Sequence, residues 1–264
     1  MVKDVDKEDE SVLLSYGEVS TITINRSKSL NALNLDVLKS LFAIIEKLEE
    51  KSEVKLVILQ GSGEKAFVAG ADIKAMYESD KSGLEEFINL GQSVMNKIEN
   101  SNKIFISKVD GYALGGGFEL ALASDIIVAS EKASFALPEV GLGLIPGFGG
   151  TQRLQRRSGI GYAKFLSISA ERIDAKTAFS KGIVDVLFEH ENFDVEFQKL
   201  LLKIVAKGSN AQVSAKKSIN NYNREVFEKG LKFEIKSFIK LAKEPEALEG
   251  MQAFLENRKP KFKE

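Results

Sequence analysis

The chain contains no cysteine among its 264 residues, which excludes disulfides, thiolate nucleophiles and thiol redox switches. Histidine is nearly absent as well, since His190 alone occurs, in the acidic stretch Phe188-Glu-His-Glu-Asn. No candidate nucleophile lies near it, and charged runs of this kind are typical of a solvated surface. No acidic or histidine cluster has the spacing of metal ligands. Thiol chemistry, a histidine-based triad and a metal centre are therefore not expected.

An excess of charge of one sign is also lacking. The 37 Lys and Arg residues face 38 Asp and Glu residues, which gives a formal net charge of −1 and no general attraction to nucleic acid or anionic membrane. No apolar run approaches the roughly 20 residues that a membrane-spanning helix needs. The first ten residues are rich in Lys, Asp and Glu, unlike an apolar signal sequence. We therefore expect a cytoplasmic protein without nucleic acid or membrane partners.

The hydrophobic pattern indicates an α/β architecture. With 44% hydrophobic and 28% charged residues, the chain has ordinary globular composition and enough length to bury a core. Short β-branched runs alternate with amphipathic helical patterns, which is typical of βα units whose helices cover a sheet. The predicted strands are 19–25, 54–60, 104–109 and 126–129; the predicted helices are 36–50, 83–99, one opened by 115–123, and one that starts at Ile73 with Asp72 as its cap.

The pattern changes near Asp194, and helical periodicity dominates from there onward. We therefore divide the chain into an α/β core over 1–193 and a helical region over 194–264. The second region carries many large apolar side chains, among them Phe233 and Phe238. These side chains could pack on the chain's own body or on another surface such as a second subunit, and the pattern favours neither.

Two glutamates stand in settings that ordinary structure does not readily explain. Glu119 follows three glycines in Gly111-Tyr-Ala-Leu-Gly-Gly-Gly-Phe-Glu-Leu, and Glu139 follows a proline in Phe135-Ala-Leu-Pro-Glu-Val-Gly-Leu-Gly. Glycines at a helix start expose backbone N–H groups that can stabilise a developing negative charge, although a tight turn with close packing is the alternative. Two carboxylates beside such a site can move protons on and off carbon and water.

Two further loops lead into predicted helices. In Phe67-Val-Ala-Gly-Ala-Asp-Ile the small residues leave room for a ligand against the backbone, although a plain capped turn also fits. The second loop, Pro146-Gly-Phe-Gly-Gly, precedes Thr151-Gln-Arg-Leu. Neither the dinucleotide-binding fingerprint nor the Walker phosphate loop matches its spacing.

Together these segments resemble the enoyl-CoA hydratase (crotonase) family, from about Val12 to Phe262. Besides the motifs already quoted, the resemblance rests on Asn25-Arg-Ser-Lys-Ser-Leu-Asn-Ala-Leu, Ser124-Asp-Ile-Ile-Val-Ala, Ile145-Pro-Gly-Phe-Gly-Gly-Thr-Gln-Arg-Leu and Glu249-Gly-Met-Gln-Ala-Phe-Leu-Glu-Asn-Arg. It implies a crotonase-like spiral of ββα units followed by a C-terminal helical trimerisation region. It also implies an acyl-CoA thioester substrate, no cofactor beyond that CoA, and a homotrimer or a hexamer built as a dimer of trimers.

The resemblance also implies a role for each matching residue. The N–H groups of Ala71 and Gly116 would form an oxyanion hole, and Gly147 would help to hold the attacking water. Glu119 and Glu139 would be the acid–base pair. The CoA-binding residues would be Lys28, Ser29, Leu30, Ala69, Ala71, Asp72, Ile73, Lys74 and Gly116, with Phe254 in a segment that approaches the CoA of a neighbouring subunit in the family.

The activity implied is that of an enoyl-CoA hydratase, which adds water reversibly to 2-trans-enoyl-CoA to give 3-hydroxyacyl-CoA in fatty acid or short-chain acyl-CoA metabolism. Glu139 would give a proton to C2 and Glu119 would activate water, although the sequence does not fix this order. A 3,2-enoyl-CoA isomerase is the first alternative, and it usually manages with a glutamate at the Glu139 position alone. A non-catalytic acyl-CoA-binding protein is the second.

Three residues depart from the family pattern. Leu137 and Phe118 stand where the family often has Gln and Cys, and Asn257 stands where a lysine often reaches the CoA phosphates. These changes leave the glutamate pair intact. They concern acyl-chain preference and phosphate contacts.

Overall fold

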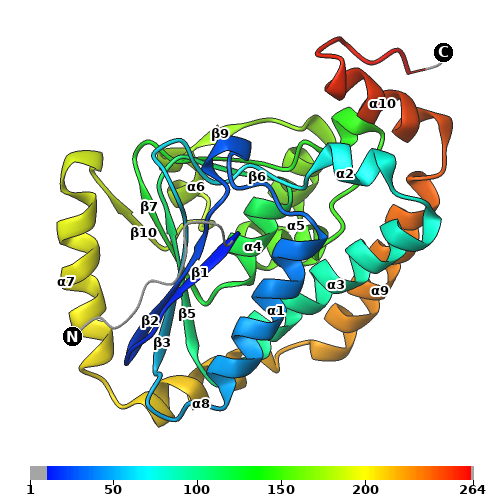
Figure 1. Ribbon diagram of the computed structural model, residues 1–264. Helices are drawn as coiled ribbons and strands as arrows, with labels where there is room; N and C mark the ends of the chain where they lie inside the picture. The colour runs from blue at the N-terminus through cyan, green and yellow to red at the C-terminus, as the bar shows by residue number, and fades with distance from the viewer. Residues whose placement is uncertain (1–10, 263–264) are drawn as a thin grey trace.

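The larger sheet forms the centre of the molecule. The computed structural model describes residues 11–262 (Figure 1), so the expectation about a signal sequence in residues 1–10 lies outside the described residues. Neighbouring strands in this sheet are parallel, except that its first two are antiparallel. In order across the sheet, the strands are β1 (Val12–Ser15), β2 (Val19–Ile24), β3 (Leu56–Gly61), β5 (Ile104–Val109), β7 (Ile126–Ser130) and β10 (Val186–Phe188).

The sheet is covered on both faces, which explains its continuous apolar strands. Along β3, Val57 and Leu59 belong to the main core, whereas Leu56 and Ile58 belong to a second cluster on the other face. Successive side chains of a strand point to opposite faces, so a strand buried on both sides needs apolar residues at every position. The apolar run predicted as a strand from residue 54 is therefore confirmed, although β3 starts at Leu56.

A smaller sheet converts the predicted βα units into a spiral of ββα units. Its strands, in spatial order, are β4 (Ala66–Val68), β6 (Tyr112–Leu114), β8 (Ser134–Ala136) and β9 (Ile173–Asp174). Each turn of the spiral runs from a long-sheet strand to a short-sheet strand and then to helix. The three turns end in α2 (Ile73–Glu78) with α3 (Lys81–Asn100), in α4 (Gly116–Ala123), and in η2 (Glu139–Leu142) with α5 (Gly150–Ser169). The spiral implied by the resemblance is confirmed.

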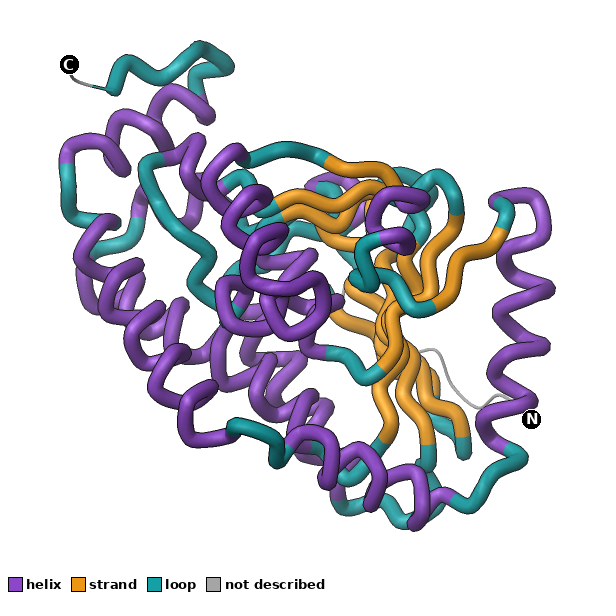
Figure 2. Tube along the Cα trace, turned by 180° about the vertical axis from the view of Figure 1, so that it is seen from behind, coloured by secondary structure: helices purple, strands orange, loops and turns teal. Residues whose placement is uncertain are grey.

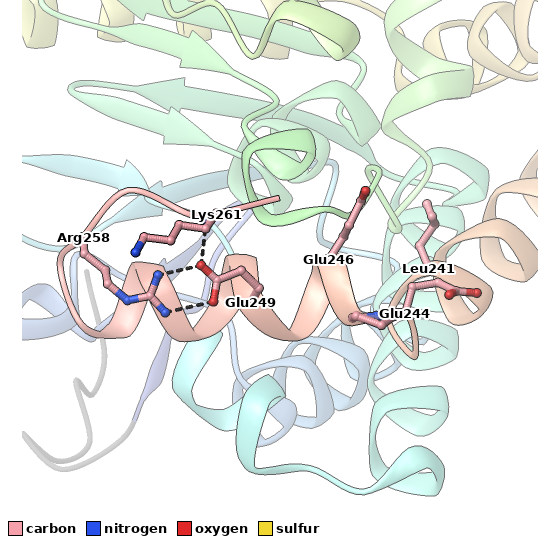
Figure 3. A pocket seen from close by; sticks show the side chains of 7 residues that line it. Leu241, Glu244, Glu246, Glu249, Arg258 and Lys261 are labelled. Atoms are coloured by element: carbon pink, nitrogen blue, oxygen red, sulfur yellow. Dashed lines mark hydrogen bonds and ion pairs between the residues drawn. The ribbon is translucent and has the colours of Figure 1, made fainter. Parts of the chain in front are cut away.

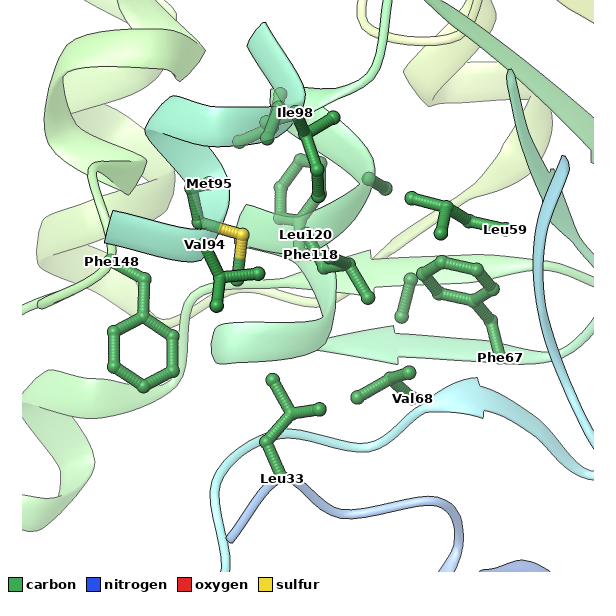
Figure 4. Packing of buried hydrophobic residues seen from close by; sticks show 14 of the residues in the cluster. Leu33, Leu59, Phe67, Val68, Val94, Met95, Ile98, Phe118, Leu120 and Phe148 are labelled. Atoms are coloured by element: carbon green, nitrogen blue, oxygen red, sulfur yellow. The ribbon is translucent and has the colours of Figure 1, made fainter. Parts of the chain in front are cut away.

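Helices form a layer on each side of the larger sheet, as Figures 1 and 2 show from opposite directions. On one side lie α1 (Leu35–Glu49), α3 and α9 (Arg224–Leu241), and on the other lies α7 (Phe193–Val205). Asn34 caps α1 by accepting the N–H of Val37 at 3.0 Å. The core around α4 is dense with large side chains (Figure 4), including Phe67, Phe118 and Phe148. The remaining elements are η1 (Ser27–Ser29), α6 (Ala175–Ser180) and η3 (His190–Asn192).

The C-terminal region is helical, as predicted. It comprises α7, α8 (Ser209–Asn220), α9 and α10 (Pro245–Leu255). Phe238 is buried within its own chain, whereas Phe233 is 73% exposed, so part of the apolar load packs on the chain's own body. Within residues 11–262, none of the helices combines the length and apolar character needed to cross a bilayer.

Helix α10 folds back across its own chain, where it packs against α2 and η2. Glycines on both sides allow the close approach. An added Cβ on Gly250 would lie 2.5 Å from the Leu142 carbonyl carbon, and one on Gly143 would lie 2.7 Å from that of Glu246. The segment brings Phe254 to a cavity of its own chain, and the contact expected with the CoA of a neighbouring subunit stays a prediction.

Candidate active site

A cavity of about 100 Å³ gathers most of the residues singled out in the sequence. It lies among the β4–α2 turn, the β6–α4 turn, η2 and the loop before α5, and side chains of α3, α9 and α10 contribute to it. Its walls are mostly apolar, with two carboxyl groups among them. The lining residues are Ala69, Gly70, Ala71, Ile73, Met76, Phe87, Ile88, Gly115, Gly116, Glu119, Pro138, Glu139, Leu142, Leu144, Gly147, Phe148, Phe238 and Phe254.

A larger hollow, of about 690 Å³, lies beside α10 and the C-terminal tail, and Figure 3 shows its charged lining. Its central carboxylate is already paired, since Glu249 accepts from Arg258 Nη1 at 2.6 Å and from Nη2 at 2.9 Å. The Arg258 guanidinium lowers the pKa of Glu249 to about 2. A carboxylate held in that state neither gives nor takes protons near neutral pH, so we place the chemistry in the smaller cavity.

Glu119 lines the cavity and is held by peptide N–H groups. It lies in the first turn of α4, every residue of which is buried. Its Oε1 accepts from Phe148 N at 2.8 Å and from Gly150 N at 2.7 Å, so neither bond occupies Oε2. Burial raises the pKa of Glu119 well above its ordinary value, the charges of Glu139 and Glu234 add to the increase, and the two N–H donors oppose it.

The carboxyl group of Glu139 has its own peptide N–H as a donor and none from the loop before α5. Glu139 is the first residue of η2, and its Oε2 is buried without a hydrogen-bond partner. Burial raises the pKa of Glu139 to about 8, its own peptide N–H opposes the increase, and the charge of Glu234 adds to it. Because peptide donors stabilise the charge on Glu119 and none is seen on Glu139 Oε2, we place the negative charge of the pair on Glu119 and the proton on Glu139.

The two predicted oxyanion donors lie next to this pair. Leu33 bridges to the β4–α2 turn by donating to Gly70 O and accepting from Asp72 N, each at 2.8 Å. Successive N–H groups of extended backbone point in opposite directions, so the N–H of Ala71 points away from Leu33. Gly116 is the first residue of α4, where an N–H has no acceptor within the helix. Both residues line the cavity, so two backbone donors are placed to serve it.

Packing accounts for more of the three glycines before Glu119 than we expected from the sequence. Gly115 has φ +50°, in the left-handed region, and an added Cβ there would lie 2.9 Å from Glu139 Oε1. A Cβ on Gly117 would lie 2.0 Å from Val68 O, and one on Gly116 would lie 3.0 Å from the Phe148 ring. The close-packing alternative therefore applies at Gly117. At Gly116 a side chain would disturb packing as well as any ligand.

The loop from Gly147 to Gly150 carries the donors that reach Glu119. Gly147 itself lines the cavity, and an added Cβ would lie 2.9 Å from the Phe238 ring. A Cβ on Gly150 would lie 2.8 Å from Glu119 Oε1, so glycine lets this carboxylate approach the backbone. The role predicted for Gly147 in holding water stays a prediction.

The predicted CoA-binding residues fall into two groups. Ala69, Ala71, Ile73, Gly116 and Phe254 line the cavity, and Phe254 is 57% exposed at its edge. The others lie outside the cavity lining, along an adjoining edge where Leu30 O accepts from Ala69 N at 3.0 Å. They are Lys28, Ser29, Leu30, Asp72 and Lys74.

The side chain of Asp72 is already engaged along this edge. Its Oδ1 caps α2 by accepting from Ala75 N at 3.3 Å, and its Oδ2 pairs with Arg26 at 3.1 Å. Its carboxylate therefore has a clear structural task in addition to any part in binding a substrate.

Glu234 is the main residue that the sequence analysis missed. It lies on α9, is 1% exposed, and accepts from Gly149 N at 2.6 Å and from Thr151 N at 2.9 Å. A signal was present, because Glu234 stands three residues after Leu231 and four before Phe238, both of which are buried. A carboxylate at that spacing lies on the apolar face of its helix.

His190 and metal binding have no part in the cavity. His190 is half-buried outside it, with Nε2 3.0 Å from Lys132 Nζ and Nδ1 3.5 Å from Asp110. Across the described part of the chain, no group of three or more His, Cys, Asp or Glu side chains is placed to hold a metal ion. The chemistry that the cavity offers is therefore that of two carboxyl groups beside backbone N–H donors.

Comparison with known proteins gives a consistent result. A family model described as "Enoyl-CoA hydratase/isomerase" matches residues 15–264. A short-chain-enoyl-CoA hydratase of Clostridium acetobutylicum is 42% identical over 248 residues, which cover 94% of this chain and 95% of the relative. A crotonyl-CoA hydratase of Syntrophomonas wolfei is 40% identical over 254 residues, which cover 96% of this chain and 98% of the relative.

Solved structures agree in fold. The crystal structure of an enoyl-CoA hydratase from Mycobacterium avium subsp. paratuberculosis superposes with a TM-score of 0.88 at 27% identity, covering 97% of this chain and 99% of that one. That of an enoyl-CoA hydratase from Bacillus anthracis gives a TM-score of 0.79 at 35% identity, covering 96% and 99%.

Proposed function

Because this chain belongs to the enoyl-CoA hydratase/isomerase family, we propose that it adds water reversibly to 2-trans-enoyl-CoA thioesters to give 3-hydroxyacyl-CoA. The observation that supports this most directly is the pair of buried carboxyl groups, Glu119 and Glu139, on one apolar cavity. The two differ in their hydrogen-bond partners, as hydration requires of a base and an acid. An isomerase needs only one such group, and a binding protein needs neither.

In the proposed reaction the thioester oxygen accepts hydrogen bonds from the N–H groups of Ala71 and Gly116. Glu119, as carboxylate, takes a proton from water while the water oxygen bonds to C3. The π electrons of the C2=C3 bond move toward C2 and the thioester oxygen, where the two donors stabilise the enolate. Glu139 then gives its proton to C2. One water has been added to the substrate, and the pair again holds one proton, which is now the one that Glu119 took from the water.

The preferred substrate in this proposal is a short-chain thioester such as crotonyl-CoA. The cavity of about 100 Å³ has room for only a few carbon atoms. The rings of Phe87, Phe148 and Phe238 are among its walls, and Phe87 contacts Phe148 edge-on with ring centroids 5.3 Å apart. The two relatives described above are named for short-chain and crotonyl substrates.

The purified chain is expected to remove the conjugated-thioester absorbance of crotonyl-CoA. Across 2-trans-enoyl-CoAs from about C4 to C16, kcat/KM should fall as the acyl chain lengthens, because each added methylene must fit against closely packed rings. Mass spectrometry of the product should show the addition of one water. A chain that binds crotonyl-CoA but leaves the absorbance unchanged would support the binding-protein alternative, and conversion of a 3-enoyl-CoA alone would support the isomerase.

We further propose that the nucleotide end of CoA lies along the edge formed by Lys28–Leu30 and Asp72–Lys74, and that Phe254 contacts CoA at the cavity edge. In the same assay, crotonyl-pantetheine lacks the nucleotide and should show a raised KM with little change in kcat, the pattern of lost uniform binding. Equal KM values for the two substrates would place the nucleotide elsewhere.

For assembly and location, we propose a homotrimer or a dimer of trimers in the cytoplasm, with residues 1–193 as the catalytic core and 194–264 as the oligomerisation region. Support comes from exposed large apolar side chains of the C-terminal helices, such as Leu202 on α7 and Val226 and Phe233 on α9, which a partner could cover. Sedimentation velocity at assay concentration should give a trimer or a multiple of it. A fully active monomer would contradict the proposed assembly.

A further inference from the structure

Four consecutive peptide N–H groups at the start of α5 are shared alternately between two buried carboxylates. Those of Phe148 and Gly150 donate to Glu119 Oε1, at 2.8 and 2.7 Å. Those of Gly149 and Thr151 donate to Glu234, at 2.6 and 2.9 Å. Neighbouring N–H groups thus point to opposite sides of the loop, and the orientation of one set fixes the orientation of the other.

Glu234 is held firmly enough to act as the fixed partner. Besides the two peptide donors, it accepts from the Thr151 hydroxyl and from Gln92 Nε2, the latter at 3.4 Å. On the other side of the loop, Arg153 Nη1 donates to Phe148 O at 2.9 Å. The loop is therefore held by Glu234 on α9 and by Arg153 within α5, and Gln92 on α3 in turn holds Glu234. Glu119 accepts from the donors that remain.

We propose that Glu234 is a positioning residue for the catalytic pair: by holding the N–H groups of Gly149 and Thr151, it aims those of Phe148 and Gly150 at Glu119 and so fixes which glutamate carries the negative charge. This inference rests on the proposed hydration. Glu234 does not line the cavity and does not touch the substrate in this scheme. Its effect passes through the loop and through its own charge.

The charge of Glu234 predicts the direction in which the pH dependence of the rate should change when this residue is substituted. Burial raises the pKa of Glu234 to about 7, while its donors at Thr151 and Gly149 and the charge of Arg153 favour the ionised form. Once ionised, it raises the pKa of Glu139 and also that of Glu119. Hydration needs the proton on Glu139, so the rate should fall as the pH rises through about 8. Removal of the Glu234 charge should move this basic limb to lower pH.

Other charged groups around Glu234 also influence the pKa values of these carboxyl groups. Arg153 on α5 is 3% exposed and pairs with Glu99 on α3 at 2.9 Å. Glu119 on α4 and Glu139 in η2 face it across the loop. A substitution that leaves all four of these in place isolates the contribution of Glu234. A purely structural role, as a cap of α5, would lower thermal stability without moving the pH profile.

The test compares Glu234→Gln with wild type on crotonyl-CoA between about pH 5 and 10. The glutamine keeps the shape, loses the charge and can accept on one oxygen only. We expect kcat at the optimum to fall by roughly tenfold, because a slightly misplaced catalytic group costs up to about 10². We also expect the basic limb to move to lower pH by on the order of one pH unit. Thr151→Val keeps the carboxylate, removes only its hydroxyl donor, and should move the limb the same way by less.

Glu228→Gln is the matched control, since Glu228 lies on the same helix, half-exposed and paired with Arg224 at 2.9 Å. It should leave rate and pH profile unchanged. An infrared titration of protonated carboxyl groups in the ligand-free protein gives a readout independent of turnover, and Glu139→Gln identifies the Glu139 band. If that band and the basic limb stay in place in both Glu234→Gln and Thr151→Val, Glu234 is a helix cap only. A wild-type chain that hydrates no enoyl-CoA would overturn the proposed function, while the infrared titration would still decide the part played by Glu234.

Discussion

Glu119→Gln and Glu139→Gln are each expected to lower kcat for crotonyl-CoA by on the order of 10² or more, the usual range for a lost acid–base group. Both changes are nearly isosteric. A glutamine at position 119 can still accept from Phe148 N and Gly150 N through its carbonyl oxygen, so the loop before α5 should keep its place. What is lost is the group that takes a proton from water. At position 139 the loss is the proton given to C2.

Steady-state kinetics at the pH optimum, with thermal unfolding of each variant, checks this expectation. Because the two groups act on one water and one substrate, the double variant should lose little more than the worse single variant. Thermal stability should not fall, since each change removes an ionisable group from a buried site. If Glu119→Gln keeps near wild-type kcat while Glu139→Gln loses it, the water-activating role assigned to Glu119 is wrong. If both variants keep wild-type kcat, the proposed mechanism is wrong.

Lys216→Met is expected to lower the free energy of unfolding by about 3–5 kcal/mol, the cost of leaving one member of a buried ion pair alone. Lys216 on α8 is 7% exposed, and its Nζ donates to Asp125 Oδ2 at 2.8 Å. It also donates to Ile98 O at 3.1 Å and to Lys103 O at 2.9 Å. One ammonium group therefore ties α8 to the end of α3, the start of β5 and the turn before β7.

Lys217→Met is the control, because Lys217 is the exposed neighbour on the same helix. Within residues 11–262 its Nζ has one hydrogen bond, to Asn102 Oδ1 at 2.6 Å. Its effect should stay within about 0.5 kcal/mol, as is usual for surface changes. The Lys216 variant should melt lower by on the order of 10 °C in a chain of this size. Adding Asp125→Asn should restore part of the loss, since the carboxylate left without its cation is removed. Equal melting temperatures for the two lysine variants would contradict this account.

The larger elements of the fold could be predicted because their residues carry a local pattern. Strand β5 coincides with the predicted 104–109, and α1 lies within one residue of the prediction at each end. The strands of the smaller sheet were not predicted. β4, β6 and β8 are three residues long, too short to show an alternation.

The candidate site could be predicted only where its residues belong to a recognisable local motif. Glu119 and Glu139 each stand in a telling local context, and the structure brings both to one cavity. Glu234 contacts Gly149 from 85 positions away, and a single sequence gives no sign of such a pairing. The position of α10 over its own chain likewise could not be predicted from the sequence. It depends on Gly143, which approaches the backbone of α10, and on Gly250 of α10, which approaches the backbone of η2.

The start of α5 has a consequence for the order in which the molecule folds. The helix has Gly149 at its N-cap and no side-chain cap of its own. The acceptors for its first N–H groups come instead from Glu119, 29 and 31 positions away, and from Glu234, 85 and 83 positions away. Closing chain segments of that length costs entropy that local contacts cannot repay. We therefore expect the first turn of α5 to form only when α4 and α9 have docked, and the catalytic geometry to be completed in the same late, cooperative step.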